Sequence, residues 1–223
     1  MDRKTIIFDM DGTLIDSAPS IISSVKDTFS HYGLPVPDDS TLRALVGPPI
    51  RIGLPLCGFP EEYLEEAMVY CRTMYGTVNR YKTVPYQGIG ALLAALKAQG
   101  HVLCVATSKP QDLTDDILKE YGLYSYFDFV CGADWSEHRD TKDSVIQYLL
   151  GKLDAASPRV MVGDTVFDVT GAAVHGIPTV AVAWGYGTTE ELLSAGAVAV
   201  ASDTEHLLHL LQVEENYKPI PRP

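Results

Sequence analysis

Residues 6–13 read Ile6-Ile7-Phe8-Asp9-Met10-Asp11-Gly12-Thr13, an apolar run that stops at two acids and a glycine. An uninterrupted apolar run is typical of a buried parallel strand, because both faces of a parallel sheet are covered. Ligands of open α/β sheets bind beyond the carboxyl ends of the strands. The sequence therefore places Asp9 and Asp11 at an edge where ligands bind.

The acid pair has simpler interpretations. Acids before a glycine also occur where a strand leaves into an ordinary turn. A calcium loop needs glycine at its sixth position, whereas Gly12 is at the fourth position when Asp9 is counted as the first. The calcium loop is thus excluded by spacing, and the turn is left as the alternative to a reactive site.

The composition is that of a globular protein and excludes two kinds of partner. Hydrophobic residues make up 46% and charged residues 21% of the 223 residues. The 29 acidic residues outnumber the 17 basic ones, and the formal charge of -12 repels nucleic acids and anionic membranes. No apolar run approaches the ~18 residues of a membrane span. The four cysteines include no C-x-x-C pair. We expect a cytoplasmic protein with reduced thiols that binds neither nucleic acid nor membrane.

From residue 84 onward, apolar runs alternate with helical patterns, which indicates βαβ units and a parallel sheet. Residues 17–82 interrupt this alternation with two amphipathic helical patterns, joined by a segment rich in glycine and proline at 47–60. We expect an α/β core of residues 1–16 plus 83–213, a helical insert at 17–82 and a loose tail at 214–223. The predicted strands after the first cover residues 101–107, 127–131, 159–162, 179–184 and an edge strand at 197–201.

Three more places carry polar residues at or after the ends of predicted strands. Thr107-Ser108-Lys109 offers hydroxyls and backbone N–H groups at the start of a helix, which suit phosphate oxygens, although Thr and Ser are also common helix starters. Lys142 begins a further helix, where a lone lysine is normally a surface residue. Asp164 and Asp168 lie four residues apart across a strand-to-helix turn, where Asp164 could also serve only as a helix cap.

The charges of these fragments suggest a metal site. Asp9, Asp11, Asp164 and Asp168 on one rim would repel one another strongly in a cleft of low dielectric constant. Oxygen ligands without histidine or cysteine favour a hard ion such as Mg²⁺. Lys142 would supply the remaining positive charge.

Taken in order, Asp9 to Thr13, Thr107, Lys142 and Gly163-Asp164 to Asp168 resemble the four motifs of the haloacid dehalogenase (HAD) superfamily of phosphohydrolases. The likeness spans nearly the whole chain. It implies a three-layer, Rossmann-like parallel-sheet core, and it implies that the insert at 17–82 is a small α-helical cap.

The resemblance also implies roles for individual residues. Asp9 would be the nucleophile that forms an aspartyl-phosphate, and Asp11 the general acid and base. The Mg²⁺ ion would be held by Asp9, the main-chain oxygen of Asp11 and Asp164, with Asp168 supporting the metal or orienting Lys142. The phosphoryl group would be held by Thr107, Ser108 and Lys142.

Residues 42–50 and 106–110 are most similar to the phosphoglycolate phosphatase-like and 5′-nucleotidase-like branch. The implied enzyme is a phosphatase, monomeric or homodimeric, that acts on a small phosphorylated metabolite. Arg43 and Arg51 could reach an anionic leaving group, or they could be ordinary surface arginines. Lys142 departs from many relatives because Asp143, rather than proline, follows it.

Three alternatives share parts of this pattern. A β-phosphoglucomutase-like mutase would carry the same four motifs and differ mainly in the cap. A phosphonate-cleaving enzyme would need a cap lysine, for which Lys26 is the only obvious candidate. A phospho-accepting receiver module would carry its acceptor aspartate in mid-chain, whereas Asp9 lies on the first strand.

Overall fold

A computed structural model describes residues 3–43, 45–47, 50–134, 139–154 and 157–213. The predicted tail at 214–223 lies outside these residues. The chain divides into two compact units, one of residues 1–14 and 85–223 and one of residues 15–84. We call them the α/β unit and the helical unit.

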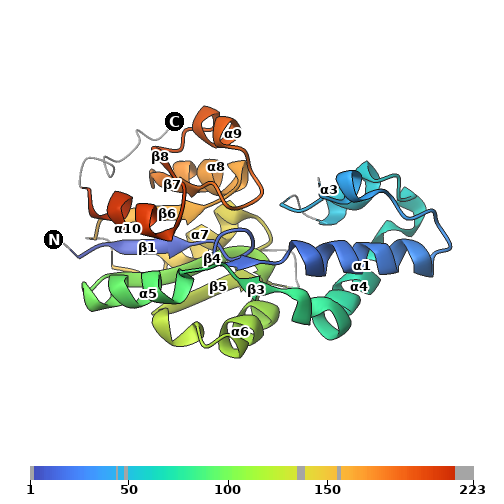
Figure 1. The fold of residues 1–223 in the computed structure, drawn as a ribbon, viewed down its shortest axis with the longest axis horizontal. Coiled ribbons are helices and arrows are strands. Elements are labelled where there is room, and N and C mark those ends of the chain that lie inside the picture. The colour runs from blue at the N-terminus through green and yellow to red at the C-terminus, as the bar shows by residue number, and fades with distance from the viewer. Residues whose placement is uncertain (1–2, 44, 48–49, 135–138, 155–156, 214–223) are drawn as a thin grey trace. The chain divides into compact units, whose positions relative to one another are not determined.

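The α/β unit is built on a sheet of six parallel strands in the order β5-β4-β1-β6-β7-β8 (Figure 1). The chain builds outward from β1 on one side through β4 and β5, and then crosses back to β6 on the other side. The carboxyl end of β1 therefore lies at a topological switch point, where open α/β sheets form their ligand crevice. The strands are β1 (Thr5–Phe8), β4 (Val102–Pro110), β5 (Phe129–Ala133), β6 (Arg159–Gly163), β7 (Thr179–Val182) and β8 (Ala199–Ala201).

Helices cover both faces of this sheet, as the apolar run in β1 predicted. Ile7 packs on one face with Val145 of α7 and Ala172 of α8. Successive side chains of a strand point to opposite faces, so the buried Ile6 and Phe8 lie on the other face of the sheet. The helices are α5 (Ile89–Ala98), α6 (Gln111–Glu120), α7 (Lys142–Leu150), α8 (Val166–Val174), α9 (Thr189–Ser194) and α10 (Thr204–Gln212).

The helical unit packs its amphipathic helices around one apolar cluster. Val25 and Phe29 of α1 meet Met68 and Cys71 of α4 in this cluster. The chain enters the unit at β2 and leaves it at β3, and these two short strands pair with each other. Its elements are β2 (Ile15–Asp16), α1 (Ala18–His31), α2 (Asp39–Arg43), α3 (Ile50–Leu56), α4 (Leu64–Met74) and β3 (Val84–Pro85), with short helical turns at Glu61–Tyr63, Tyr75–Asn79 and Arg80–Lys82.

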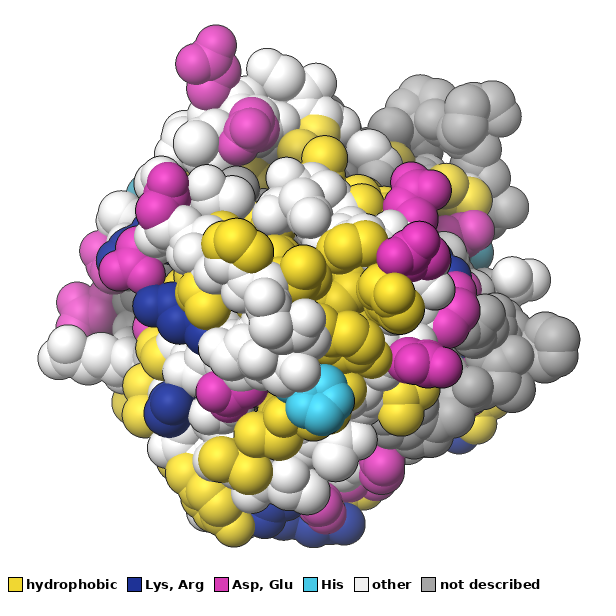
Figure 2. All heavy atoms as spheres, turned by 90° about the vertical axis from the view of Figure 1, so that its right-hand side faces the viewer, with side chains coloured by type: hydrophobic (Ala, Val, Ile, Leu, Met, Phe, Trp, Pro, Cys, Tyr) yellow, Lys and Arg dark blue, Asp and Glu magenta, His cyan; other side chains and the backbone are white. Residues whose placement is uncertain are grey.

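Several large apolar side chains of the helical unit remain exposed, among them Ile52, Leu56, Val69 and Val78. Figure 2 shows hydrophobic side chains gathered in a broad yellow area on the face turned to the viewer. Among the described residues, no helix is long and apolar enough to cross a membrane.

Several boundaries differ from those that the sequence predicted. The strands predicted at 179–184 and 197–201 are shorter and cover Thr179–Val182 and Ala199–Ala201. The strand predicted at 127–131 begins at Phe129, because Phe127 ends the preceding turn and packs edge-on against Phe8. The strand predicted at 101–107 extends to Pro110, since its pairing with β5 resumes there after a register shift. The segment at 47–60, predicted to join two helices, contains α3, whose Leu54 is fully buried.

Candidate active site

Several of the site residues predicted from the sequence lie at the carboxyl ends of three adjacent strands. Asp9 and Asp11 follow β1, Thr107 lies in the last part of β4, and Asp164 follows β6. Because β1 pairs with both β4 and β6, these residues meet at the switch point. The fold thus gathers groups that are up to about 155 residues apart in the chain.

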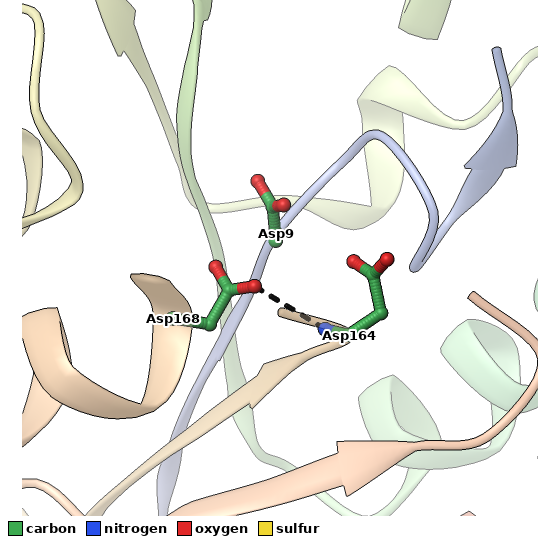
Figure 3. A group of neighbouring side chains, drawn as sticks. All are labelled: Asp9, Asp164 and Asp168. Carbon is green, nitrogen blue, oxygen red and sulfur yellow. Dashed lines mark hydrogen bonds between the residues drawn. The ribbon is translucent and has the colours of Figure 1, made fainter. Parts of the chain in front are cut away.

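Three carboxylates form a buried acidic cluster, which we define as Asp9, Asp164 and Asp168 (Figure 3). One oxygen of each lies within 4.8 Å of the others. Asp9 is 7% exposed, and both other residues are 0% exposed. Buried carboxylates this close repel one another unless a cation compensates them.

Lys142 supplies one such cation from the first turn of α7. Its Nζ lies 2.5 Å from Asp9 Oδ1 and 2.7 Å from Asp168 Oδ1, and it donates to the carbonyl of Ala106 at 3.0 Å. Burial lowers the pKa of the lysine, but the charges of Asp168 and Asp9 outweigh this effect and raise the pKa above its ordinary value. Lys142 is therefore a charged group fixed between two carboxylates.

With all three acids ionised, the acidic cluster and Lys142 together carry a net negative charge. Burial raises the pKa of Asp9 from 3.8 to about 6, against the opposing charge of Lys142, and Asp168 adds to the rise. Burial, followed by the charges of Asp168 and Asp9, raises the pKa of Asp164 well above its ordinary value. One ammonium does not neutralise three carboxylates, and every ligand atom is an oxygen. The cluster fits a hard divalent metal ion.

Asp164 is held by two segments, of which the sequence analysis had connected only residues 9–13 with it. Its Oδ1 accepts from the Thr13 hydroxyl at 2.9 Å, and its Oδ2 accepts from the Tyr186 N–H at 2.9 Å. The backbone of Gly12, with φ +80°, approaches so closely that a Cβ there would lie 2.1 Å from Asp164 Oδ2. Glycine is thus required beside the acid pair for a packing reason as well as for its backbone conformation.

The N-cap residue of α8 is Thr165, and the Asp168 side chain, rather than that of Asp164, completes its capping box. The Asp168 Oδ2 accepts from the N–H groups of Asp164 and Thr165, at 3.2 and 3.0 Å, and from the Thr165 hydroxyl at 2.8 Å. The dashed line in Figure 3 marks the first of these bonds. The capping role that the sequence left open for Asp164 is therefore wrong, because Asp168 reaches back over the first turn and uses its other oxygen to contact Lys142.

Asp11 has a partner that the sequence analysis missed. The Nζ of Lys109 lies 3.0 Å from both carboxylate oxygens of Asp11. The lysine side chain is only 5% exposed, and that of Asp11 is 24% exposed. The signal was present in Thr107-Ser108-Lys109, since alternation along a strand puts the first and third residues on the same side.

The remaining predicted site residues are Thr107 and Ser108 of β4 and two arginines of the helical unit. Thr107 is buried and its hydroxyl accepts from the Lys109 N–H at 3.3 Å, whereas the Ser108 side chain is exposed. In the helical unit, Arg51 forms an ion pair with Glu65 and Arg43 is exposed at the end of α2. The assignment of these two arginines to a leaving group stays a prediction.

Comparison with known proteins identifies the family. A sequence model described as haloacid dehalogenase-like hydrolase matches residues 6–182, which include every residue of the acidic cluster and both lysines. The chain belongs to this family, as its motif order predicted.

Individual relatives carry different names. The chain is 39% identical over 213 residues to the tyrosine-protein kinase PtkA of Mycobacterium tuberculosis, covering 94% of this chain and 73% of that protein. It is 31% identical to a 5′-nucleotidase of Pseudomonas aeruginosa, over 93% of this chain and 95% of that protein. The crystal structure of a predicted phosphatase from Clostridium acetobutylicum matches with a TM-score of 0.87 and 34% identity, covering 96% of this chain and all of that one.

Proposed function

We propose that the protein hydrolyses phosphate monoesters with Asp9 as the nucleophile. The observation that carries this proposal is the environment of Asp9, a buried carboxylate that ends β1 beside two further acids and in contact with Lys142. Membership of a hydrolase family and the 5′-nucleotidase relative support the same reaction.

The proposed reaction has two steps that use the same pair of acids. An oxygen of Asp9 attacks phosphorus, the bond from phosphorus to the ester oxygen breaks, and the protonated Asp11 gives its proton to the leaving oxygen. Water then attacks the aspartyl-phosphate and gives a proton to Asp11. The bond from Asp9 to phosphorus breaks, and phosphate leaves.

Positive groups at the switch point support the transferring phosphoryl group. Lys142 contacts Asp9, Thr107 is buried in the last part of β4, and Ser108 follows it in the same strand. We propose that these three residues bind the phosphoryl oxygens, since phosphoryl transfer depends mainly on positioning and charge neutralisation.

We further propose Mg²⁺ as the metal ion, held by Asp9, the main-chain oxygen of Asp11 and Asp164, with Asp168 behind them. When bound, it would supply positive charge that offsets the repulsion between the nucleophile and the phosphate. Asp168 would keep Lys142 in place through the 2.7 Å contact with its ammonium.

The proposed substrate is a small phosphorylated metabolite such as a nucleoside 5′-monophosphate or phosphoglycolate. The test is phosphate release from an aryl phosphate and from a panel of such metabolites, with Mg²⁺ and then with EDTA. Asp9→Asn should abolish release, and the exposed Glu190→Gln serves as the matched control. Activity that survives both EDTA and Asp9→Asn would refute the proposal, and isomerisation of a sugar phosphate without phosphate release would favour the mutase.

A second candidate is phosphoryl transfer to a protein, which the relative named tyrosine-protein kinase favours. The protein is incubated with ATP labelled on the γ-phosphate, alone and with a tyrosine-containing polypeptide. Acid-stable label on the polypeptide would support this candidate, whereas release of labelled phosphate alone would support hydrolysis.

A further inference from the structure

We propose that the α/β unit carries a second ligand site, separate from the acidic cluster, that binds a flat organic cation such as an aromatic quaternary amine. The site is a cleft of about 500 Å³, which we call the aromatic cleft. This volume lies within the range that holds small organic ligands. The lining of the aromatic cleft includes Tyr86, Trp184, Asp203 and Glu205.

The two aromatic side chains form a corner of the cleft. The ring centroids of Tyr86 and Trp184 lie 6.4 Å apart, with their planes at 60° to each other. Both residues are half-buried, so each ring is anchored in the protein but retains solvent-accessible surface. The face of an aromatic ring attracts a cation, and two inclined faces can contact one ligand together.

The charged side chains that line the aromatic cleft indicate whether its ligand is a cation or an anion. Asp203 and Glu205 are the charged residues of the lining, and both are acidic. The Asp203 carboxylate accepts from the His206 N–H and the Ser202 hydroxyl, both at 2.8 Å, and these bonds lower its pKa. Negative charge at the rim therefore persists at neutral pH, which favours a cation over an anion.

The walls of the aromatic cleft are bonded to the segment that carries the proposed nucleophile. The Trp184 indole N–H donates to the carbonyl of Thr13 at 3.1 Å, and the Tyr86 N–H donates to the carbonyl of Leu14 at 3.1 Å. The Thr13 hydroxyl in turn donates to Asp164. A ligand between the rings would therefore touch groups that help to fix the acidic cluster.

The test measures binding through Trp184 and needs no enzymatic activity. The chain contains two tryptophans, and Trp135→Phe leaves Trp184 as the sole indole. The full chain with this change is titrated with trimethylphenylammonium, with benzoate as the anion of similar size and with benzyl alcohol as the neutral compound. We expect the cation to quench the Trp184 fluorescence saturably with a Kd of about 1 mM or below. This Kd should be about tenfold lower than that of either other compound.

Two variants separate the cation site from general stacking. Glu205→Gln removes an exposed charge. It should weaken the binding of the cation about threefold and leave the binding of benzyl alcohol unchanged. Glu190→Gln, which changes an exposed acid outside the cleft, should change neither. Three results would overturn the proposal. They are quenching that does not saturate, equal affinity for the cation and the neutral compound, and an equal change in cation affinity in Glu205→Gln and Glu190→Gln. Because binding is read from fluorescence, these outcomes are independent of whether the protein hydrolyses phosphate esters.

Discussion

The buried charge of Asp9 should cost the metal-free protein stability, and Asp9→Asn should restore it. In the folded protein the pKa of Asp9 is about 6, whereas the ordinary value is 3.8. At 1.36 kcal/mol for each pH unit, this rise corresponds to about 3 kcal/mol of unfolding free energy. Asparagine imitates the protonated acid, so the variant should unfold about 6–12 °C above the wild type at pH 8.

The pH range in which Asp9→Asn is more stable than the wild type follows from the direction of the Asp9 pKa shift. A raised carboxylate pKa costs almost nothing below the unfolded value of 3.8; the cost grows between pH 3.8 and about 6, and it is constant above that. The gain in unfolding temperature of Asp9→Asn should therefore vanish near pH 4 and level off above pH 7. Scanning calorimetry in EDTA from pH 4 to pH 8 measures this gain, with Glu190→Gln as the surface control.

Added Mg²⁺ should reverse the order of the two proteins at pH 8. The ion stabilises the native state by mass action, and the wild type offers it one more carboxylate than the variant does. A variant that melts at or below the wild type at pH 8 in EDTA, or whose gain is constant with pH, would refute the reasoning from buried charge.

Three further substitutions test the contacts around the cluster. Lys142→Met leaves two buried carboxylates without their cation and should lower the unfolding free energy in urea by about 3–5 kcal/mol; a neutral effect would contradict the ion-pair account. Lys109→Met should lower kcat on an aryl phosphate about 10–100-fold with partial rescue by Lys109→Arg, and a change confined to KM would argue against a positioning role. Thr13→Val removes the hydroxyl that donates to Asp164 and should weaken Mg²⁺ binding about 10–100-fold by calorimetry, so an unchanged Kd would exclude that support.

The parallel sheet could be predicted from the sequence because both of its faces are covered. Each buried strand is then a nearly continuous apolar run, as in residues 5–8 and 159–163, and the run stops at the edge where the acids stand. The end of β4 was harder to predict, because residues 107–110 are polar or proline and pair with β5 only after a register shift. Composition carries no information on such a shift.

The partners of the acids were predictable only in part. The contact of Asp168 with Lys142 was one of the two roles that the family resemblance implied for Asp168. The bonds from Lys109 to Asp11 and from Tyr186 to Asp164 join segments 98 and 22 residues apart. Long-range partners of this kind depend on the relative placement of strands, which local patterns do not determine.

Asp164 belongs to the acidic cluster and is linked through Thr13 to Trp184 of the aromatic cleft. Its two oxygens accept from segments that follow the two neighbours of β6 in the sheet, Thr13 after β1 and Tyr186 after β7. Trp184 lies two residues before Tyr186 and itself donates to Thr13, so the three contacts close a ring around one carboxylate. Burial raises the pKa of Asp164, and the hydrogen bonds from Tyr186 and Thr13 oppose this rise by stabilising the ionised carboxylate. Any ligand that displaces Trp184 should therefore weaken metal binding, and any metal bound at Asp164 should oppose that displacement by the same free energy.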